Sequence, residues 1–441
     1  MRCRLNDALI LRGARVVDPA SGRDETADVR IEGEQITDIG KISTNRAEEI
    51  DCTGLILAPG FVDLHAHLRE PGREDAETVA SGTRAAARGG FTAVCAMANT
   101  DPVADSAAIV EQVAALGRAA GLADVYPVGA ISVGLQGEQL AELGEMAMSS
   151  ARVNFFSDDG KCVQSAGLMR RALEYARAFD AVVANHAEEG ALAGGGQMNE
   201  GEVSSILGIA GIPAEAEDVI VARDLALAKL TGARLHVPHV STAGTVELIR
   251  AAKARGVRVT AEATPHHLAL TDDLVSGYDP VYKVAPPLRT RDDVDAVRKG
   301  LADGTIDCVA TDHAPHPPED KEREFDLAPC GMLNLETALG VVVTELVDPG
   351  LLGWLRLIEA MSTAPARARG LDGHGGPIAP GAPANLAVFD PTAAWIVEPE
   401  KLASKSKNTP FAGRTLKGKV VHTMLRGRFT VREGSDADGQ G

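Results

Sequence analysis

Two histidines that stand two positions apart, His65 and His67, give this sequence its clearest chemical signal. They end an apolar run that is typical of a β-strand, and residues i and i+2 of a strand point to the same face. The two imidazoles would then converge on one point, as the ligands of a metal ion must. The pair alone is weak, because two surface or hydrogen-bonded histidines give the same pattern.

Further side chains of the metal-ligating types follow other apolar runs of the chain. Each lies at or just after the end of a run; they are Asp158, Asp159, His186, His239 and Asp312. Four imidazoles with these carboxylates exceed the three or four protein ligands of one zinc ion, so the set fits two ions that share a bridging carboxylate. His65, His67 and Asp312 would hold the first ion. His186 and His239 would hold the second.

This set of ligands also indicates the metal and the chemistry. Mixed imidazole and carboxylate ligation suits Zn²⁺, with Mn²⁺ or Co²⁺ as alternatives. Two ions can lower the pKa of a shared water and polarise a carbonyl group. The sequence therefore predicts hydrolysis, or its reverse, at an amide-like carbon.

The elements that must position these ligands follow a repeated pattern of short apolar runs and Ala-rich helical stretches. The runs are Ile56–Asp63, Thr92–Ala96, Val125–Ile131, Val153–Phe156, Ala181–Asn185, Leu235–Val240, Val257–Ala263 and Ile306–Ala310. The pattern predicts an α/β chain, either a (β/α)8 TIM barrel or an open doubly wound sheet. We favour the barrel, because its site is built at the carboxyl ends of several strands, which in an open sheet would lie in a row.

The two ends of the chain differ from this central part. Both contain short strand-like segments between turn residues, which predicts a small β-sandwich domain composed of residues 1–55 and 375–432. Chain ends are often neighbours in space. Residues 56–374 would form the barrel, and residues 433–441 are predicted to be a disordered tail, since they carry little apolar surface.

Composition and charge exclude several classes of protein. The chain has 441 residues, is 45% hydrophobic, and carries a formal net charge of −18, which argues against nucleic-acid and membrane-surface partners. No apolar run approaches the roughly 18 residues of a membrane span, and the first residues do not resemble a secretion signal. Six scattered cysteines without metal-site spacing favour a reduced, cytoplasmic protein.

Several longer motifs resemble those of one family. They are His65–Gly72 (HAHLREPG), Phe156–Gly160 (FSDDG), Thr264–Leu268 (TPHHL), Ala310–His316 (ATDHAPH) and Lys407–Phe411 (KNTPF). In this order, over residues 10 to 430, the chain resembles the class I dihydroorotases of the cyclic amidohydrolase superfamily. The resemblance implies a metal-bearing (β/α)8 barrel with a β-sandwich made from both chain ends.

The resemblance also implies a reaction, the reversible hydrolysis of (S)-dihydroorotate to N-carbamoyl-L-aspartate in pyrimidine synthesis, by a hydroxide shared between two zinc ions. Asp312 would be the catalytic acid and base. Many relatives bridge the metals with a carboxylated lysine, whereas this family has an aspartate. Asp159 precedes His186 by the family's spacing, so we expect Asp159 rather than Asp158 or Lys161 to be the bridge.

Substrate contacts follow from the same resemblance. They are expected at His67, Arg69, Asn99, Ala285, His316, Cys330 and Gly331. Arg69 offers a fork to the substrate carboxylate. Many relatives have asparagine where this chain has Ala285, so that side-chain contact is missing. The polar loop of residues 317–329 is expected to close as a lid.

Three functions stay open at this point. The first is dihydroorotase, the second another cyclic amidohydrolase such as a hydantoinase or allantoinase, and the third an inactive structural partner of aspartate carbamoyltransferase. Asp159, Arg69 and Asn99 favour the first. Further copies of the chain, giving a homo-oligomer, and aspartate carbamoyltransferase are the macromolecular partners considered. The remaining histidines and the carboxylates Asp63 and Glu262 are expected to have structural or supporting roles.

Overall fold

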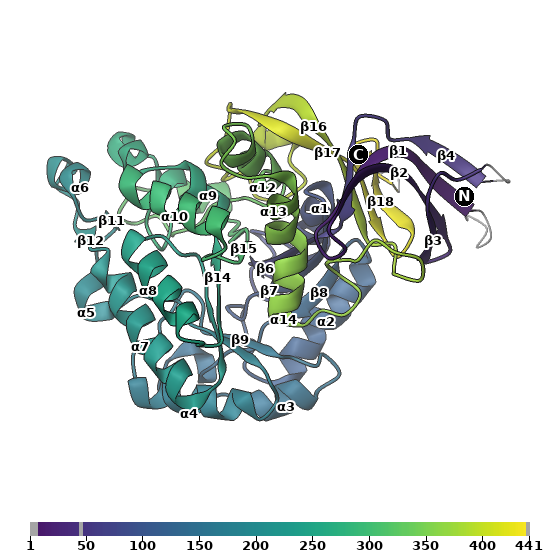
Figure 1. The fold of residues 1–441 in the computed structure, drawn as a ribbon. Coiled ribbons are helices and arrows are strands. Elements are labelled where there is room, and N and C mark those ends of the chain that lie inside the picture. Colours follow the sequence, from purple (N-terminus) through teal and green to yellow (C-terminus); the bar gives the residue numbers. More distant parts are fainter. Residues whose placement is uncertain (1–7, 44–46, 438–441) are drawn as a thin grey trace.

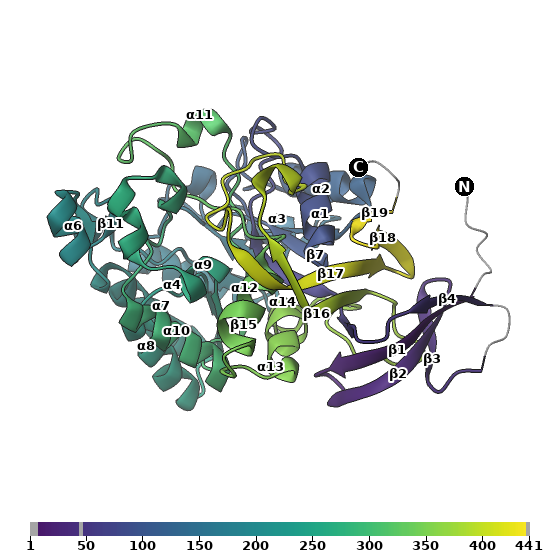
Figure 2. The ribbon, with the colours of Figure 1, turned by 90° about the horizontal axis from the view of Figure 1, so that it is seen from above.

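The computed structural model describes residues 8–43 and 47–437 and shows an α/β chain with two kinds of sheet (Figures 1 and 2). One kind is parallel and lies among helices. The other is a large sheet of strands from both chain ends, and it lies to one side of the first (Figure 2).

Eight parallel strands follow one another in the central part. They are β6 (Phe61–Ala66), β7 (Phe91–Ala96), β8 (Asp124–Pro127), β9 (Phe155–Ser157), β10 (Val182–Ala184), β13 (Arg234–Val237), β14 (Val259–Ala263) and β15 (Cys308–Val309). They pair as two sheets, β6-β7-β8 and β9-β10-β13-β14-β15. Single parallel bridges, Gly129 with Phe156 and Ala66 with His313, join the margins of the two sheets. The strands therefore succeed one another around a ring, and their carboxyl ends share one rim.

The longer helices of the central part lie between these strands in the sequence. They are α1 (Val79–Arg88), α2 (Ala107–Ala120), α4 (Ala166–Arg177), α7 (Glu215–Thr231), α8 (Ala243–Ala254) and α10 (Arg291–Asp303). In α4 the buried residues Leu168, Ala172 and Ala176 recur every four positions, so one stripe of the helix packs inward. Ser165 caps its first turn by accepting a hydrogen bond from the Leu168 amide. The apolar stripe and the cap thus fix the inward face and the first turn of this helix.

Shorter elements complete the central part. They are α3 (Leu143–Met148), α5 (Gly190–Ala193), β11 (Met198–Asn199), α6 (Glu202–Leu207), β12 (Gly211–Ile212), α9 (Pro265–Ala269), α11 (Pro318–Lys321), α12 (Ala338–Val342), α13 (Trp354–Ile358) and α14 (Ala364–Arg369). Elements α5, β11, α6 and β12 form an excursion, residues 190–212, that projects from the helices (Figure 1).

The two chain ends together build the second sheet, here called the terminal sheet. Its strands are β1 (Ala8–Asp18), β2 (Arg23–Glu32), β3 (Gln35–Gly40), β4 (Ala47–Asp51), β5 (Ile56–Pro59), β16 (Leu386–Ile396), β17 (Thr415–Leu425), β18 (Arg428–Arg432) and β19 (Ser435–Asp436). Strand β5 pairs with β1 on one side and β16 on the other, so it joins the two ends of the chain. Leu11, Val29 and Val388 belong to the hydrophobic core of this sheet.

The first apolar run is divided differently from the prediction. The sequence predicts one strand over residues 56–63, but residues 56–59 belong to the terminal sheet as β5 and β6 begins at Phe61. Gly60 separates them, and a Cβ there would lie 2.3 Å from the Thr92 side chain, so only glycine permits this crossing. The boundary predicted at residue 55 therefore lies four residues too early.

The predicted disordered tail is wrong for residues 433–437. Strand β19 pairs with β18 in antiparallel fashion. The Asp436 carboxylate lies 2.8 Å from Arg88 Nε and 3.3 Å from Arg84 Nε, both on α1. The segment is held by polar contacts, so its low apolar content was a poor guide to whether it is ordered. Residues 438–441 lie outside the described residues.

None of the described helices is both long and apolar enough to span a membrane. The cysteines in the described ranges, Cys52, Cys95, Cys162, Cys308 and Cys330, form no disulfide with one another.

Candidate metal centre

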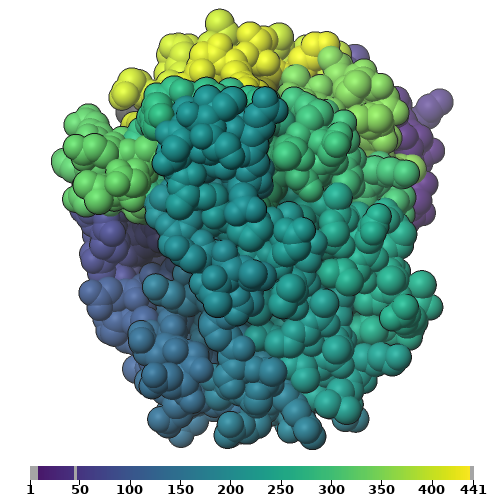
Figure 3. Space-filling view, turned by 90° about the vertical axis from the view of Figure 1, so that its left-hand side faces the viewer, coloured from purple at the N-terminus to yellow at the C-terminus, as the bar shows by residue number. Residues whose placement is uncertain are grey.

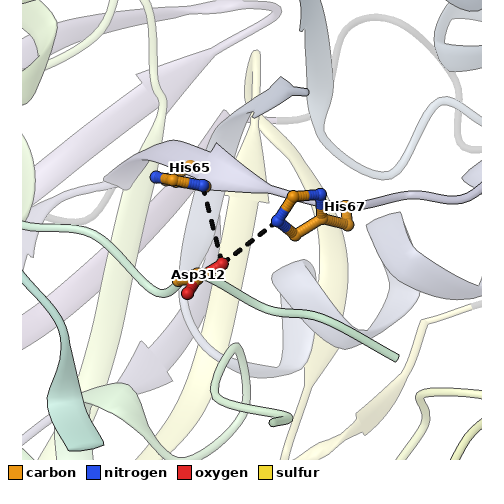
Figure 4. Close-up of side chains that lie close together, drawn as sticks. All are labelled: His65, His67 and Asp312. Atoms are coloured by element: carbon orange, nitrogen blue, oxygen red, sulfur yellow. Dashed lines mark hydrogen bonds and ion pairs between the residues drawn. The ribbon is translucent and has the colours of Figure 1, made fainter. Parts of the chain in front are cut away.

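His65 near the end of β6 and His67 just after it point into the rim of the parallel strands, where they meet Asp312 (Figure 4). Asp312 follows β15, and its Oδ1 lies 3.5 Å from His65 Nε2 and 3.1 Å from His67 Nε2. All three residues are buried, with 0%, 5% and 5% of their surface exposed. Because His65 and His67 keep the strand period of two, their imidazoles share one face.

Three further candidate ligands lie against this group. Asp159 Oδ1 is 3.3 Å from His65 Nε2, 3.4 Å from His239 Nε2 and 3.7 Å from His186 Nδ1. Its other oxygen lies 3.4 Å from His67 Nε2. One carboxylate therefore touches all four imidazoles, which is the position that a group bridging two metal ions must have.

The donor atoms have the burial and the spacing that a metal site needs. The His65 Nε2 and Asp159 Oδ1 atoms are buried and make no hydrogen bond with any described residue. With metal–ligand bonds of about 2.0–2.1 Å, two donors of a tetrahedral ion lie about 3.4 Å apart. The observed separations of 3.3 and 3.5 Å from His65 Nε2 to the two carboxylates match this value. The residues fit divalent metal.

The charges of the candidate ligands also favour a bound divalent metal. Burial opposes the charged form of His65, yet the carboxylates of Asp159 and Asp312 raise its pKa well above the usual value. The same contacts, against burial, lower the pKa of Asp159 and of Asp312. The carboxylates thus require nearby positive charge, which a divalent cation would supply while the imidazoles stay neutral and able to ligate.

Two partners behind the histidines fix which nitrogen faces the centre. His65 donates from Nδ1 to Glu262 on β14 at 2.8 Å, and Glu262 also contacts His236 Nε2 at 2.9 Å. His67 donates from Nδ1 to the Asn99 side-chain oxygen at 2.9 Å. Both Nε2 atoms are thereby left as acceptors toward the centre. The sequence predicts Asn99 only as a substrate contact and gives no sign of this bond to His67.

The neighbouring candidates for the bridge point elsewhere. Asp158 accepts hydrogen bonds from the Ile131 and Ser132 amides at 2.7 and 3.0 Å, and from the Ser132 hydroxyl. It therefore holds the loop after β8. Lys161 is exposed, and its amide closes the turn by donating to the Asp158 carbonyl at 2.9 Å. Of the three residues, Asp159 alone contacts the histidines.

Asp63 ties the first and last strands of the ring together. It accepts from the Thr311 amide at 2.8 Å, from the Thr311 hydroxyl at 2.5 Å, and from the His65 amide at 3.2 Å. Burial raises the pKa of Asp63 to about 7, although these bonds oppose the shift. His65 and Asp312 are both candidate ligands. The bonds of Asp63 to His65 and Thr311 therefore set the spacing between these two ligands.

Three of the expected substrate residues gather beside the histidine group. Arg69 Nε donates to the Pro315 carbonyl at 3.1 Å, and Arg69 Nη2 lies 3.4 Å from His316 Nε2. His316 Nε2 donates to the Cys330 carbonyl at 2.8 Å. Burial and the Arg69 cation lower the pKa of His316 to about 3, so the imidazole is neutral.

The loop that carries Ala285 reaches the same place. The Gly331 amide donates to the Lys283 carbonyl at 2.9 Å, which sets residues 283–285 next to residues 330–331. Asn99 lies beside the turn that follows Asp159: its Nδ2 would be 3.5 Å from a Cβ on Gly160. Among the described residues no acceptor is found for that Nδ2, and it remains open to a ligand.

The loop of residues 317–329 is bound down in this structure. Lys283 Nζ donates to the carbonyls of Phe325 and Asp326 at 2.7 and 3.0 Å. Lys321 Nζ, within the loop, donates to the Pro280 carbonyl outside it at 3.1 Å. Figure 3 shows green atoms of this loop at the left edge and the teal excursion of residues 190–212 standing forward. That the loop is a lid stays a prediction.

The remaining histidines have protein partners. His267 Nε2 donates to the Pro286 carbonyl at 3.1 Å, and His374 contacts Thr92 and Asp124. His313 lies 3.5 Å from Glu77, and His422 accepts from the Glu433 amide at 3.2 Å. His266 Nδ1 accepts from Asn334 at 3.0 Å. These contacts are those of supporting residues.

Comparison of the whole structure with solved structures gives the class of protein. The L-hydantoinase (dihydropyrimidinase) of Arthrobacter aurescens superposes with a TM-score of 0.86 at 27% identity, covering 98% of this chain and 97% of that one. The dihydropyrimidinase of Brevibacillus agri gives 0.83 at 25% identity, covering 98% and 96%. The fold is therefore that of the cyclic amidohydrolases.

Sequence comparison narrows the class. A family profile described as Dihydro-orotase-like matches residues 54–245. Proteins named dihydroorotase from Leifsonia xyli and Streptomyces coelicolor are each 56% identical to this chain; the first match covers 98% of this chain and 97% of the relative, and the second 96% and 98%. This chain belongs to the dihydroorotase family.

Proposed function

We propose that this chain catalyses the reversible hydrolysis of (S)-dihydroorotate to N-carbamoyl-L-aspartate, a step of pyrimidine biosynthesis. It is a metal-dependent cyclic amidohydrolase, and relatives named dihydroorotase are 50–56% identical to it over nearly their full length. The observation that carries the proposal is the meeting of four imidazoles on Asp159, with Asp312 against two of them.

The proposed centre holds two zinc ions. His65, His67 and Asp312 would hold one, His186 and His239 the other, and Asp159 would bridge them. When bound, the ions supply a water of lowered pKa and polarise the scissile carbonyl. The buried, unpartnered His65 Nε2 and Asp159 Oδ1 atoms support this assignment.

Asp312 is the proposed acid and base. It would take the proton of the attacking water and deliver it to the amide nitrogen that leaves the ring. The imidazoles next to it, against burial, lower its pKa, which keeps the carboxylate in the ionised form that a base must have. Its contact with both His65 and His67 keeps it beside the reacting atoms.

Arg69 and Asn99 are proposed to bind the substrate carboxylate. Arg69 Nε bonds to the Pro315 carbonyl, and this bond fixes the direction of the guanidinium fork. Asn99 uses its oxygen on His67, so its amino group can donate to the ligand. His67, Ala285, His316, Cys330 and Gly331 would surround the ring.

We further propose that the ring of parallel strands is a (β/α)8 barrel and that the chain ends form a composite β-sandwich domain. The two bridges that join the margins of the parallel sheets support the barrel. The pairing of β5 with both β1 and β16 supports the composite domain, whose first segment would extend to residue 59. The resemblance also favours a cytoplasmic homo-oligomer that can assemble with aspartate carbamoyltransferase; light scattering of the chain alone and mixed with the transferase tests this.

The function is tested by an assay that separates it from its nearest alternatives. The zinc-loaded protein is given dihydroorotate, hydantoin and allantoin in parallel, and bound metal is measured on the same sample. We expect turnover of dihydroorotate at least a hundredfold faster than of the other two, with about two ions per chain. Turnover of hydantoin or allantoin alone, or a chain that binds no metal and stays inactive after zinc addition, would refute the proposal.

A further inference from the structure

A segment of the C-terminal half reaches the metal-bearing rim from the terminal sheet. Residues 403–409, here called the strap, lie between β16 and β17 in sequence. In Figure 2 the yellow loop between these strands extends from the terminal sheet over the parallel strands. The strap includes part of the KNTPF motif, to which neither the reaction nor the metal centre assigns a role.

Two carboxylates of the central part, the buried Glu77 and the half-buried Glu336, hold the first half of the strap. Glu336 accepts from the Ala403 and Ser404 amides at 2.8 and 3.2 Å. Glu77 accepts from the Lys405 amide at 3.1 Å and from the Ser404 hydroxyl. The strap is therefore bound to the segments that follow β6 and β15, the two strands at whose carboxyl ends His65, His67 and Asp312 lie.

The second half of the strap carries Asn408, whose side-chain oxygen and nitrogen both bond to backbone groups. Asn408 Nδ2 donates to the Ala314 carbonyl at 3.0 Å and to the Gly331 carbonyl at 3.2 Å. Asn408 Oδ1 accepts from the His316 amide at 3.1 Å. Asn408 is 7% exposed, so these bonds form away from competing water. One amide thus joins the backbone on both sides of the loop of residues 317–329.

The groups that Asn408 joins are crowded against each other. Gly331 has a φ of +143°, and a Cβ there would lie 2.8 Å from His316 Nε2 and 2.8 Å from the Ala314 Cβ. His316 in turn donates to the Cys330 carbonyl. The Gly331 backbone therefore lies directly against the His316 imidazole, with no room for a side chain between them.

We propose that Asn408 is a positioning residue for dihydroorotate binding. It acts through others: it sets the His316 imidazole and the Gly331 backbone at the separation at which both can contact the substrate ring. This inference rests on the proposed function, because the ligand of His316 and Gly331 is the ring of dihydroorotate. A merely structural role predicts loss of stability alone, whereas positioning predicts loss of substrate binding with the metal centre intact.

The test compares two asparagines with similar surroundings. Asn408→Asp keeps the acceptor for the His316 amide but loses both donors and turns a carboxylate toward two carbonyls. Asn385→Asp is the matched control: Asn385 is also 7% exposed, donates to the Gly373 carbonyl at 2.8 Å and accepts from the Arg426 amide at 2.7 Å, next to the terminal sheet rather than at the rim. Asn408→Ala is made as well, since it buries no charge.

We expect Asn408→Asp and Asn408→Ala to raise the KM for dihydroorotate roughly tenfold or more while kcat falls less than about threefold. The reason is that His316 and Gly331 bind the ring equally well in the ground state and the transition state, so their displacement weakens both by the same amount. Bound zinc should equal that of the wild type. Asn385→Asp should lower the melting temperature and leave KM unchanged.

Three results separate the possible failures. A wild-type chain without dihydroorotase activity refutes the proposed function. An active wild type with a KM in both Asn408 variants within twofold of Asn385→Asp refutes the positioning role and leaves the function standing. Loss of zinc in parallel with activity also refutes it, because Asn408 would then act on the metal centre.

Discussion

At the residue scale, a change at Asp312, the carboxylate after β15, should affect catalysis more than metal binding. Asp312→Ala removes the proposed acid and base and one ligand of six. We expect kcat to fall about 10³-fold or more, since general acid–base catalysis alone contributes about 10²–10⁴-fold. Bound metal should fall only in part, because Asp159 and the histidines remain. Kinetics and metal analysis on one preparation check this.

The control for that change is Asp158→Asn, one position before the proposed bridging residue Asp159. Asp158 is buried like Asp312 but bonds to the loop after β8 rather than to the histidines. The Asp158→Asn variant should be less stable than the wild type, but its kcat should lie within about threefold of the wild-type value. A kcat for Asp312→Ala within tenfold of the wild type would contradict the assigned role.

Glu262 allows a second prediction at this scale, about metal affinity. Despite burial, His236 and His65 lower its pKa to about 2, so Glu262 is an anion that strengthens His65 as a ligand. Glu262→Gln keeps the shape and removes the charge, and we expect zinc affinity to fall about 10–100-fold. Competition with a chelating dye measures it, with Glu247→Gln on the exposed face of α8 as control. Equal affinities in the two variants would exclude this role.

Residues of the site divide into those that the sequence can reveal and those that it cannot. His65 and His67 are visible because strand period alone brings them together, and Asp159, His186, His239 and Asp312 because each follows a strand. The bond between His67 and Asn99 joins residues that are 32 positions apart, and the bonds of Asn408 reach residues that are 77 to 94 positions away. No local pattern encodes such separations.

At the scale of elements, alternation of strand and helix was enough to predict the parallel part, but not where its first strand begins. The split at Gly60 depends on Thr92 of a neighbouring strand, and β19 depends on two arginines of α1. In both cases a contact that is distant in sequence overrides a local signal of apolarity, which is why the sequence predicts one strand and a disordered tail instead.

The arginine contacts of β19 predict how tightly the C-terminal end is held. Asp436→Asn should free the strand, because two ion pairs, one of them a two-bond contact with Arg88, lose their charge. We expect trypsin to cleave after Arg432 several-fold faster and the melting temperature to fall by about 1–3 °C. Mass spectrometry of the released peptide follows the cleavage.

Asp348→Asn is the matched control, since it removes an exposed ion pair with Lys417 on β17. Exposed pairs contribute about 0–1 kcal/mol, so neither cleavage nor stability should change measurably. Identical cleavage rates in the two variants would mean that β19 is held by its strand pairing alone.

At the scale of the whole molecule, the candidate metal ligands lie in or just after the parallel strands, and a strap from the terminal sheet reaches the same rim. The two parts must therefore keep a fixed relation for the substrate contacts to form. Asp124, at the start of β8, is one of the groups that fixes it. Arg426, after β17, donates to both Asp124 oxygens at 2.6 and 3.0 Å, and His374 Nε2 donates at 3.0 Å.

This contact predicts a pH dependence with a definite sign. Burial opposes ionisation of Asp124, yet His374 and Arg426 lower its pKa below the usual 3.8. A carboxylate with a lowered folded-state pKa stabilises the protein above the unfolded-state value and loses that effect as pH falls through the folded-state value. Asp124→Asn should therefore lower the melting temperature by about 2–4 °C at pH 7, and the difference from wild type should disappear as the pH falls below the usual pKa of 3.8 and through the lowered folded-state value.

A second carboxylate, Asp24, serves as the control for the contact between the terminal sheet and the parallel strands. Asp24 also has a lowered pKa, from its bond with Arg15, but both lie in an exposed hairpin of the terminal sheet. Asp24→Asn should change the melting temperature by less than about 1 °C at either pH, since solvent screens that pair. Because both variants retain the metal centre, acid release of metal affects them equally and cancels in the difference. A pH-independent loss in Asp124→Asn would show that packing, not its charge, joins the terminal sheet to the metal-bearing strands.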